Sequence, residues 1–177
     1  LDVTLRPSFF YGRKSMTFYP GMTRLPEGSA PKTTSASHTI TVKATIPESG
    51  AEGVLICIGG DSSGWSLCME EGKLVYHYNW FDTERYKVES AVPLAPGKAE
   101  IRMDFVNLGE KPGGPASVNL FVNDKKVGSG KLPKQVAYRF SVESMDVGMD
   151  TMSPVSKTYV EKLPFEFNGE IESVKLD

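Results

Sequence analysis

Residues 73–80 read KLVYHYNW, and this stretch decides the fold. Every second side chain in it is large and apolar: Leu74, Tyr76, Tyr78 and Trp80. Side chains that alternate in this way lie on one face of a β-strand, which indicates a strand with that face against a core. Residues 99–106 repeat the alternation, and no stretch keeps apolar residues at helical spacing over three turns. Helix is therefore predicted to be scarce.

The same period of two continues outward from this strand in both directions. Segments rich in Val, Ile, Tyr, Phe and Thr are predicted as strands at residues 37–46, 53–59, 64–69, 73–80, 85–90, 99–106, 116–122, 136–141 and 165–176. Turn residues separate them: Gly72 suits a tight turn after residues 70–71, and Asn123-Asp124 suits a second one. Many short strands without a β-α-β rhythm predict an all-β fold, a two-sheet antiparallel sandwich or jelly roll, in a single domain.

The composition is that of an ordinary folded domain, and it excludes several classes of function. The chain has 177 residues, of which 40% are hydrophobic and 24% charged, with a formal net charge of −2. The sequence has no clustered basic patch and no apolar run near the ~20 residues that cross a bilayer, so neither nucleic acid nor a membrane is an expected partner. The chain begins at Leu1 without the order of a signal peptide, which we interpret as a piece of a longer protein.

The two cysteines, Cys57 and Cys68, flank a predicted turn near residues 62–63. They could therefore lie opposite each other on paired strands and form a disulfide. A pair of buried free thiols is the preferred interpretation, because cysteine commonly behaves as a small core residue. We predict that the two are not bridged.

Candidate catalytic and metal-binding residues are few. The two histidines, His38 and His77, lie in predicted strands without a metal-ligand spacing to another His or Cys, so no metal site is predicted. No pair of nucleophile and base is recognisable, so no catalytic residue is assigned. Asp146 and Asp150 offer oxygen ligands of the kind that Ca²⁺ binds, but a turn stabilised by its own side chains explains both carboxylates and is preferred.

Pairs of carboxylates leave a sandwich-fold glycosidase open as an alternative. The nearest candidates are Glu70 with Glu71, and Glu100 with Asp104. Glycoside hydrolysis needs two carboxyl groups about 5–10 Å apart across a sugar cleft. Arg102 lies between Glu100 and Asp104 on the same strand face, which is typical of a solvated polar row. The polar row is therefore the preferred interpretation.

Aromatic residues in and beside residues 73–80 have two interpretations. Aromatic faces on an open sheet stack on sugar rings, and this favours a carbohydrate-binding surface. The residues that would form it are Trp65, Tyr78, Trp80 and Phe81. The same rings also suit the inward face of a sandwich, which is the preferred interpretation for most of the row. Trp80 and Phe81 stand at the strand end, where a core absorbs them less easily, and are the expected points of contact.

Several strings along the chain, taken in order, look like those of a known family. They are FYPGM (18–22), LPEGSAP (25–31), SHTIT (37–41), GKLVYHYNW (72–80), DVG (146–148) and SPVS (153–156). This series resembles the C-terminal region of bacterial arylsulfatases over nearly the whole chain. The resemblance implies a lectin-like jelly roll, similar to laminin-G and concanavalin modules, that follows an alkaline-phosphatase-like catalytic domain.

The chemistry of sulfatases is not carried over to these residues. That family makes formylglycine from the Cys of a Cys-x-Pro/Ala-x-Arg signature, beside a Ca²⁺ site, and neither Cys57 nor Cys68 is followed by such a signature. The resemblance therefore implies a non-catalytic domain without a cofactor, which packs on the catalytic domain of a sulfate ester hydrolase and supports it. Formylglycine and Ca²⁺ are expected in the catalytic domain of the longer parent protein. A periplasmic or secreted location of that protein is compatible with the resemblance.

The beginning of the chain is expected to meet that catalytic domain. Residues 1–36 are predicted as a loop-rich lead-in, because residues 19–36 hold three Pro and two Gly. Apolar side chains there have no strand to place them, and Tyr19, Met22 and Leu25 are predicted to form the interface. The alternative function is a carbohydrate-binding module that recognises a sulfated glycan through the aromatic residues above.

Overall fold

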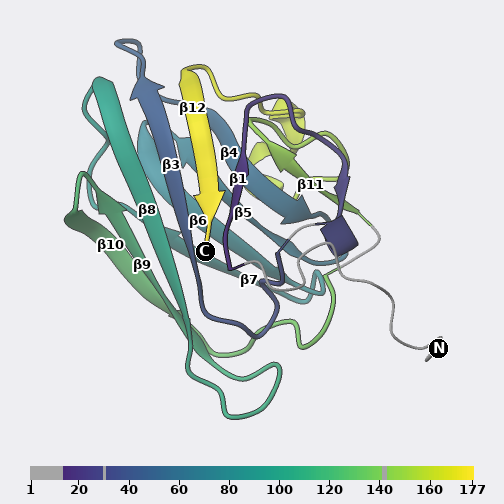
Figure 1. The fold of residues 1–177 in the computed structure, drawn as a ribbon. Helices are drawn as coiled ribbons and strands as arrows, with labels where there is room; N and C mark the ends of the chain where they lie inside the picture. The colour runs from purple at the N-terminus through teal and green to yellow at the C-terminus, as the bar shows by residue number, and fades with distance from the viewer. Residues whose placement is uncertain (1–13, 30, 141–142) are drawn as a thin grey trace.

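The computed structural model describes residues 14–29, 31–140 and 143–177, which form two antiparallel six-stranded sheets packed face to face (Figure 1). Sheet A has the strand order β1 (Met16–Phe18), β12 (Glu170–Leu176), β3 (His38–Ile46), β8 (Gly97–Asn107), β9 (Ala116–Val122) and β10 (Lys125–Leu132). Sheet B has the order β2 (Leu25–Pro26), β11 (Ser144–Val147), β4 (Gly53–Gly59), β5 (Gly64–Glu70), β6 (Lys73–Trp80) and β7 (Glu84–Glu89). The predicted two-sheet sandwich is confirmed.

Helix in the described part of the chain is limited to two short 3-10 turns, as predicted. They are η1 (Glu27–Ser29) and η2 (Lys157–Lys162). The two tight turns that the sequence indicated are also present. Glu71 and Gly72 take φ values of 51° and 74° between β5 and β6, and Asn123 and Asp124 take 49° and 63° between β9 and β10. Two consecutive positive φ values are the conformation of a type I′ hairpin, whose twist matches that of the strands.

Two of the predicted strands are wrong in place or extent. Residues 136–140 form no strand, although Val136 and Phe140 are buried, and residue 141 lies outside the described part. The last strand begins at Glu170 and not at residue 165. A strand missing from the prediction, β10, has a polar sequence with two glycines, Gly128 and Gly130. A Cβ on Gly130 would lie 2.6 Å from the Val88 side chain, so close packing requires glycine at this position. Glycine has no side chain, and its presence therefore hides the alternation of apolar and polar residues by which a strand is recognised in the sequence.

The first core lies between the sheets and takes every second side chain of the long central strands. On β3 and β8 it holds Ile40, Val42, Ile101 and Met103, all fully buried. The strand alternation seen in the sequence places their neighbours on the outer face of sheet A, where they are charged or polar. The sandwich is thus held by the inward faces of both sheets, with aromatic rings at its centre.

A second core lies on the outer face of sheet B. Val54, Cys57, Cys68 and Val75 point to this face and are buried. Residues 149–165, which we call the cover segment, pack on them through Val155, Tyr159 and Phe165. Both cysteines are free and buried here, in agreement with the predicted absence of a bridge. Sheet B is therefore covered on both faces, while sheet A is covered on one.

The lead-in residues are more integrated into the domain than the sequence indicated. β1 pairs with β12 and β2 pairs with β11, so part of the segment extends the two sheets. Met22 and Leu25 pack against the first core, and the Met22 carbonyl accepts a hydrogen bond from the Val147 amide. Both side chains are half-buried, so these two residues belong partly to the core of this domain, and their contact with another domain stays a prediction. Tyr19 is 56% exposed, and residues 1–13 lie outside the described part.

Candidate functional site

The four aromatic residues predicted to bind carbohydrate separate into two groups. Trp65 and Tyr78 are 0% and 2% exposed and lie in the first core, so neither ring can reach a ligand, and their assignment to a binding surface is wrong. The Trp65 indole donates a hydrogen bond to Thr33, and the Tyr78 hydroxyl accepts one from the Val136 amide. Trp80 is half-buried, and Phe81 is 49% exposed. The strand end is therefore where β6 leaves the core.

The turn after β6 holds Phe81 in a conformation that bulky side chains rarely adopt. Phe81 and Asp82 have φ values of 52° and 51°, and the Thr83 amide donates to the Trp80 carbonyl, which closes a turn of type I′ within the loop between the paired residues Trp80 and Glu84. This turn favours Asn and Gly, because the left-handed region costs other residues roughly 1–2 kcal/mol. Strained residues of this kind cluster at binding sites. The turn places the Phe81 ring at the surface, edge-on to Trp80 at 5.3 Å between centroids.

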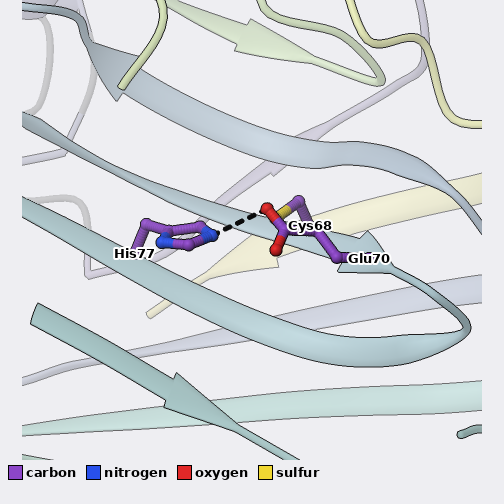
Figure 2. Close-up of side chains that lie close together, drawn as sticks. All are labelled: Cys68, Glu70 and His77. Carbon is purple, nitrogen blue, oxygen red and sulfur yellow. Dashed lines mark hydrogen bonds and ion pairs between the residues drawn. The ribbon is translucent and has the colours of Figure 1, made fainter. Parts of the chain in front are cut away.

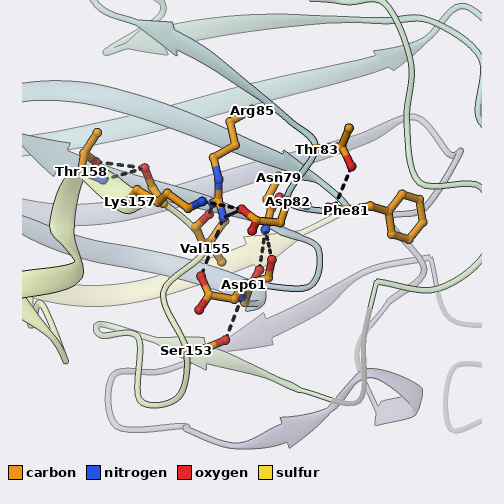
Figure 3. Close-up of polar contacts among 12 residues, drawn as sticks. Asp61, Asn79, Phe81, Asp82, Thr83, Arg85, Ser153, Val155, Lys157 and Thr158 are labelled. Carbon is orange, nitrogen blue, oxygen red and sulfur yellow. Dashed lines mark hydrogen bonds and ion pairs between the residues drawn. The ribbon is translucent and has the colours of Figure 1, made fainter.

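Polar contacts hold this turn in place (Figure 3). The Asn79 side chain accepts a hydrogen bond from the Asp82 amide at 2.9 Å and donates to the Gly60 carbonyl at 2.7 Å. Asp82 also binds Lys157 at 2.8 Å and Arg85 at 2.6 Å. Hydrogen bonds from these two cations, that of Lys157 first, lower the pKa of the Asp82 carboxyl. The turn is thus tied both to the β4–β5 loop and to the cover segment.

The turn after β6 forms one part of the site, and the irregular segment 133–140 forms the other. Hydrogen bonds also fix this segment in place. The Gln135 carbonyl accepts a hydrogen bond from the Trp80 indole at 3.2 Å, and the Gln135 amide donates to the Gly113 carbonyl. The Tyr138 carbonyl accepts a hydrogen bond from the Thr34 hydroxyl. A backbone fixed on both sides presents its side chains without a large loss of entropy on binding.

These two parts line a largely apolar groove of about 450 Å³. Trp80 and Phe81 line it from the end of β6, and Tyr138, 77% exposed, lines it from segment 133–140. Two cations stand at the rim. Lys134 lies over the Trp80 ring at 3.6 Å from the centroid and pairs with Glu84 at 2.6 Å.

The second cation is Arg139, whose side chain is 68% exposed while its Nε lies 3.0 Å from Glu27. The pairing of Lys134 with Glu84 also acts on its neighbours. The hydrogen bond from Lys134 lowers the pKa of the Glu84 carboxyl, and burial, with a hydrogen bond to Glu84, raises the pKa of Tyr86 to about 12. The groove therefore offers flat apolar rings beside two positively charged groups.

Sequence reasoning missed Tyr138 for a specific reason. Its spacing from Val136 and Phe140 puts all three on one face of a strand, and that face would be the core. Val136 and Phe140 are indeed buried, but the segment is not a strand, and Tyr138 turns outward. No local pattern in the sequence signals this, because the turn depends on hydrogen bonds to residues about 100 positions earlier.

A second cleft, of about 500 Å³, lies on the outer face of sheet A. Lys43, Lys98, Glu100 and Glu170 line it, and its lining has no aromatic side chain. Glu100 belongs to the carboxylate pair of the glycosidase alternative, but Asp104 accepts a hydrogen bond from Thr39 and pairs with Arg102. This is the polar row that the sequence indicated.

The second carboxylate pair and the possible Ca²⁺ loop are also occupied by protein contacts. Glu70 binds His77 at 2.8 Å and accepts a hydrogen bond from the Thr158 hydroxyl, so this carboxylate already has a structural role. Asp146 accepts hydrogen bonds from Arg24 and Thr151. Asp150 accepts them from the Val155 amide and the Tyr159 hydroxyl. These contacts support the structural turn.

Comparisons with known proteins concern the fold. The chain matches no protein-family model and no curated protein. Among solved structures it is similar to the CBM40 of the Ruminococcus gnavus IT-sialidase bound to α2,3-sialyllactose, at 14% identity and a TM-score of 0.61, over 92% of this chain and 88% of that one. The LG1-3 region of the laminin α2 chain gives 15% and 0.60, over 92% of this chain and 30% of that one.

Domains LG4-5 of the mouse laminin α1 chain are similar as well, at 11% identity and a TM-score of 0.58, over 91% of this chain and 41% of that one. At these identities the likeness shows the fold. The chain therefore has the lectin-like jelly roll of laminin-G and CBM40 modules, as the resemblance implied. None of these structures is a sulfatase. No helix in the described residues is long and apolar enough to cross a membrane.

Proposed function

We propose that this chain is a carbohydrate-binding module that takes its glycan in the groove that Phe81 and Tyr138 line. The observation that carries the proposal is that two exposed aromatic rings, Phe81 and Tyr138, line one groove, each on a backbone held by hydrogen bonds. Flat apolar rings with polar edges suit the faces of sugar rings. Phe81 keeps its ring at the surface although its left-handed φ is unfavourable for a bulky side chain, and this favours a role in contact.

The charges at the rim favour an acidic glycan. Lys134 and Arg139 flank the aromatic rings, and Arg139 keeps much of its side chain exposed although it pairs with Glu27. Arginine binds carboxylate and sulfate-like groups in a bidentate manner. The similar CBM40 structures hold α2,3- and α2,6-sialyllactose, which are acidic glycans. A sialylated or sulfated sugar is therefore the class of ligand to test first.

The test is calorimetric titration with 3′-sialyllactose, a sulfated disaccharide and lactose. We expect the acidic sugars to bind more tightly than lactose, and Tyr138→Ala to weaken binding about 3- to 10-fold, because a stacked ring contributes roughly 1 kcal/mol. The matched control is Tyr19→Ala, which removes an exposed tyrosine that does not line the groove. Equal loss in both variants, or no binding of any of these sugars at millimolar concentration, contradicts the proposal.

The resemblance of the ordered series of strings to the C-terminal region of arylsulfatases motivates a second proposal, that this module is one part of a longer sulfate ester hydrolase. Tyr19 is then a candidate contact with the catalytic domain, since it is exposed next to residues that pack inward. Formylglycine and Ca²⁺ would reside in that other domain. A Cys-x-Pro/Ala-x-Arg signature in the complete gene would support this proposal, and a complete gene without one would overturn it. The module alone is expected to show no turnover of an aryl sulfate.

A further inference from the structure

Three potential metal ligands come together on the outer face of sheet B (Figure 2). Cys68 and Glu70 come from β5, and His77 comes from β6, which pairs with β5 in antiparallel register. The pairing sets Cys68 opposite Val75, so His77 lies diagonally from it on the same face, and Glu70 folds back between them. Cys68 and His77 are buried, and Glu70 is half-buried. Cys68 and Glu70 lie on the same strand, and the tight turn between β5 and β6 separates them from His77, a spacing that matches no common metal motif.

The distances within this cluster approach those of a tetrahedral site. His77 Nε2 lies 2.8 Å from Glu70 Oε1, Cys68 Sγ lies 3.9 Å from the same oxygen, and all three ligand atoms lie within 4.8 Å of one another. Zinc bonds of about 2.0–2.3 Å place neighbouring ligand atoms about 3.3–3.6 Å apart. Rotations that move each atom by less than about 1 Å would therefore make room for an ion.

A fourth potential ligand atom, a hydroxyl oxygen, lies beside these three atoms. The Thr158 hydroxyl, from η2 of the cover segment, donates to Glu70 Oε1 at 2.5 Å and lies 3.5 Å from His77 Nε2. This is the place of the fourth ligand, taken by the hydroxyl itself or by a water that displaces it. A hollow of about 260 Å³ borders Glu70 and Thr158 and gives an ion a route from solvent.

We propose that Cys68, Glu70 and His77 bind a divalent transition ion of the zinc class. Sulfur and imidazole ligands select such ions over Ca²⁺ or Mg²⁺, which prefer oxygen. The Cys68 thiol loses its proton to solvent as the sulfur–metal bond forms, while His77 binds as the neutral ring. The charges of thiolate and carboxylate then balance that of the ion, which suits a buried position.

The other cluster with ligand-type atoms differs in the state of its carboxylates. Cys57, Asp146 and Asp150 also lie within 4.8 Å of one another. The Asp146 and Asp150 carboxylates accept hydrogen bonds from backbone amides, which cannot turn away from them, whereas the hydrogen-bond partners of Glu70 are side chains. That cluster also has no histidine. It therefore serves as the internal comparison for the proposed site.

Occupation of the site would fasten the cover segment to sheet B. Thr158 in η2 donates a hydrogen bond to Glu70. An ion bound at this place would link η2 to β5 and β6, the two strands beneath it. An ion that binds only the folded chain stabilises it by mass action. A hundredfold excess of free zinc over its Kd should therefore raise the melting temperature by about 5–10 °C.

The test uses the reduced chain and Co²⁺ as the probe, followed by displacement with Zn²⁺. We expect a sulfur-to-cobalt charge-transfer absorption that saturates at one ion per chain. Cys68→Ala should abolish the absorption, and His77→Gln should weaken binding at least tenfold while it keeps the thiol. Cys57→Ala is the matched control, since it removes the other buried thiol of the same core, and it should leave both the absorption and the affinity unchanged.

Three results would overturn the proposal. The first is the absence of a thiolate absorption and of a melting shift at millimolar Co²⁺ and Zn²⁺ in the unaltered chain. The second is an absorption that Cys57→Ala removes and Cys68→Ala does not, which would place the ion at the other cluster. The third is equal affinity of His77→Gln and the unaltered chain. The first measurement needs no variant, so a failure of Cys68→Ala to fold does not affect it.

Discussion

The two faces of sheet B differ in how they are covered. Its inner face packs against sheet A, a whole sheet of long strands, whereas its outer face packs against the single cover segment, residues 149–165. As a result β4 is buried along its whole length, while β3 of sheet A alternates between core and surface. The comparison teaches that a strand covered on both sides loses the alternation from which burial is inferred.

The two cores also contain different polar groups. The first core encloses His38, stacked on Phe105 at 4.8 Å between ring centroids. The second core encloses Asp150 and the two thiols, beside the Glu70–His77 pair. A large core can bury a neutral ring among apolar side chains, whereas the small second core depends on hydrogen bonds to carboxylates. Each core should therefore respond differently to truncation and to pH.

Truncation in the second core has the largest expected effect. Tyr159 is 1% exposed, stacks on Phe165 at 5.0 Å, and donates its hydroxyl hydrogen bond to Asp150. Tyr159→Ala should lower the free energy of unfolding by about 3–5 kcal/mol, measured by urea denaturation. The neighbouring Val160 is 45% exposed, and Val160→Ala should change it by less than about 0.5 kcal/mol. Similar small losses in both variants would mean that the cover segment does not form a core.

Acid should weaken the first core through His38. Burial lowers the pKa of the His38 ring to about 4, so the folded state disfavours the proton that the unfolded chain accepts near pH 6.5. Its contribution is fully present above about pH 6.5 and is lost as the pH falls towards 4, which amounts to about 3 kcal/mol. Urea denaturation of His38→Leu between pH 7 and 4 should lack this loss. An unchanged slope in that variant would contradict the assignment.

Asp150 in the second core should act in the opposite direction over a similar range. Burial raises the pKa of this carboxyl to about 6, so the folded state holds a proton that the unfolded chain releases near pH 4. Its contribution is fully present below about pH 4 and is lost as the pH rises through 6, by about 2–3 kcal/mol. Asp150→Asn removes this term, so acidification should destabilise that variant more steeply than the unaltered chain. A shallower fall would refute the prediction.

The smallest effect on the free energy of unfolding is expected for a change at Phe81, where β6 leaves both cores. Phe81 is in the left-handed region, and Asn is better suited to that position of a type I′ turn. Phe81→Asn should therefore raise the free energy of unfolding by about 0.5–1 kcal/mol while it weakens glycan binding at the groove. Thermal denaturation and the calorimetric titration measure the two effects on the same sample. A loss of stability would mean that the Phe81 ring is held by packing and not presented for contact.

The sequence by itself determined the class of fold. Alternation in residues 37–46, 73–80 and 99–106, with turn residues at Gly72 and at Asn123-Asp124, is enough to specify antiparallel strands, because both signals act over a few neighbouring residues. The same local signals correctly placed Trp80 and Phe81 at the end of a strand. They also misplaced Trp65 and Tyr78, since alternation says which side chains share a face but not what covers that face.

Only the tertiary structure decided which faces became core and which became surface. The second core exists because residues 149–165 pack across β4, β5 and β6, and the groove exists because Tyr138 turns outward and lines it together with Phe81. The cluster of Cys68, Glu70 and His77 likewise depends on strand register and on Thr158 from a distant segment. These arrangements join residues tens of positions apart, and their free energy comes from burial and hydrogen bonds that no local pattern encodes.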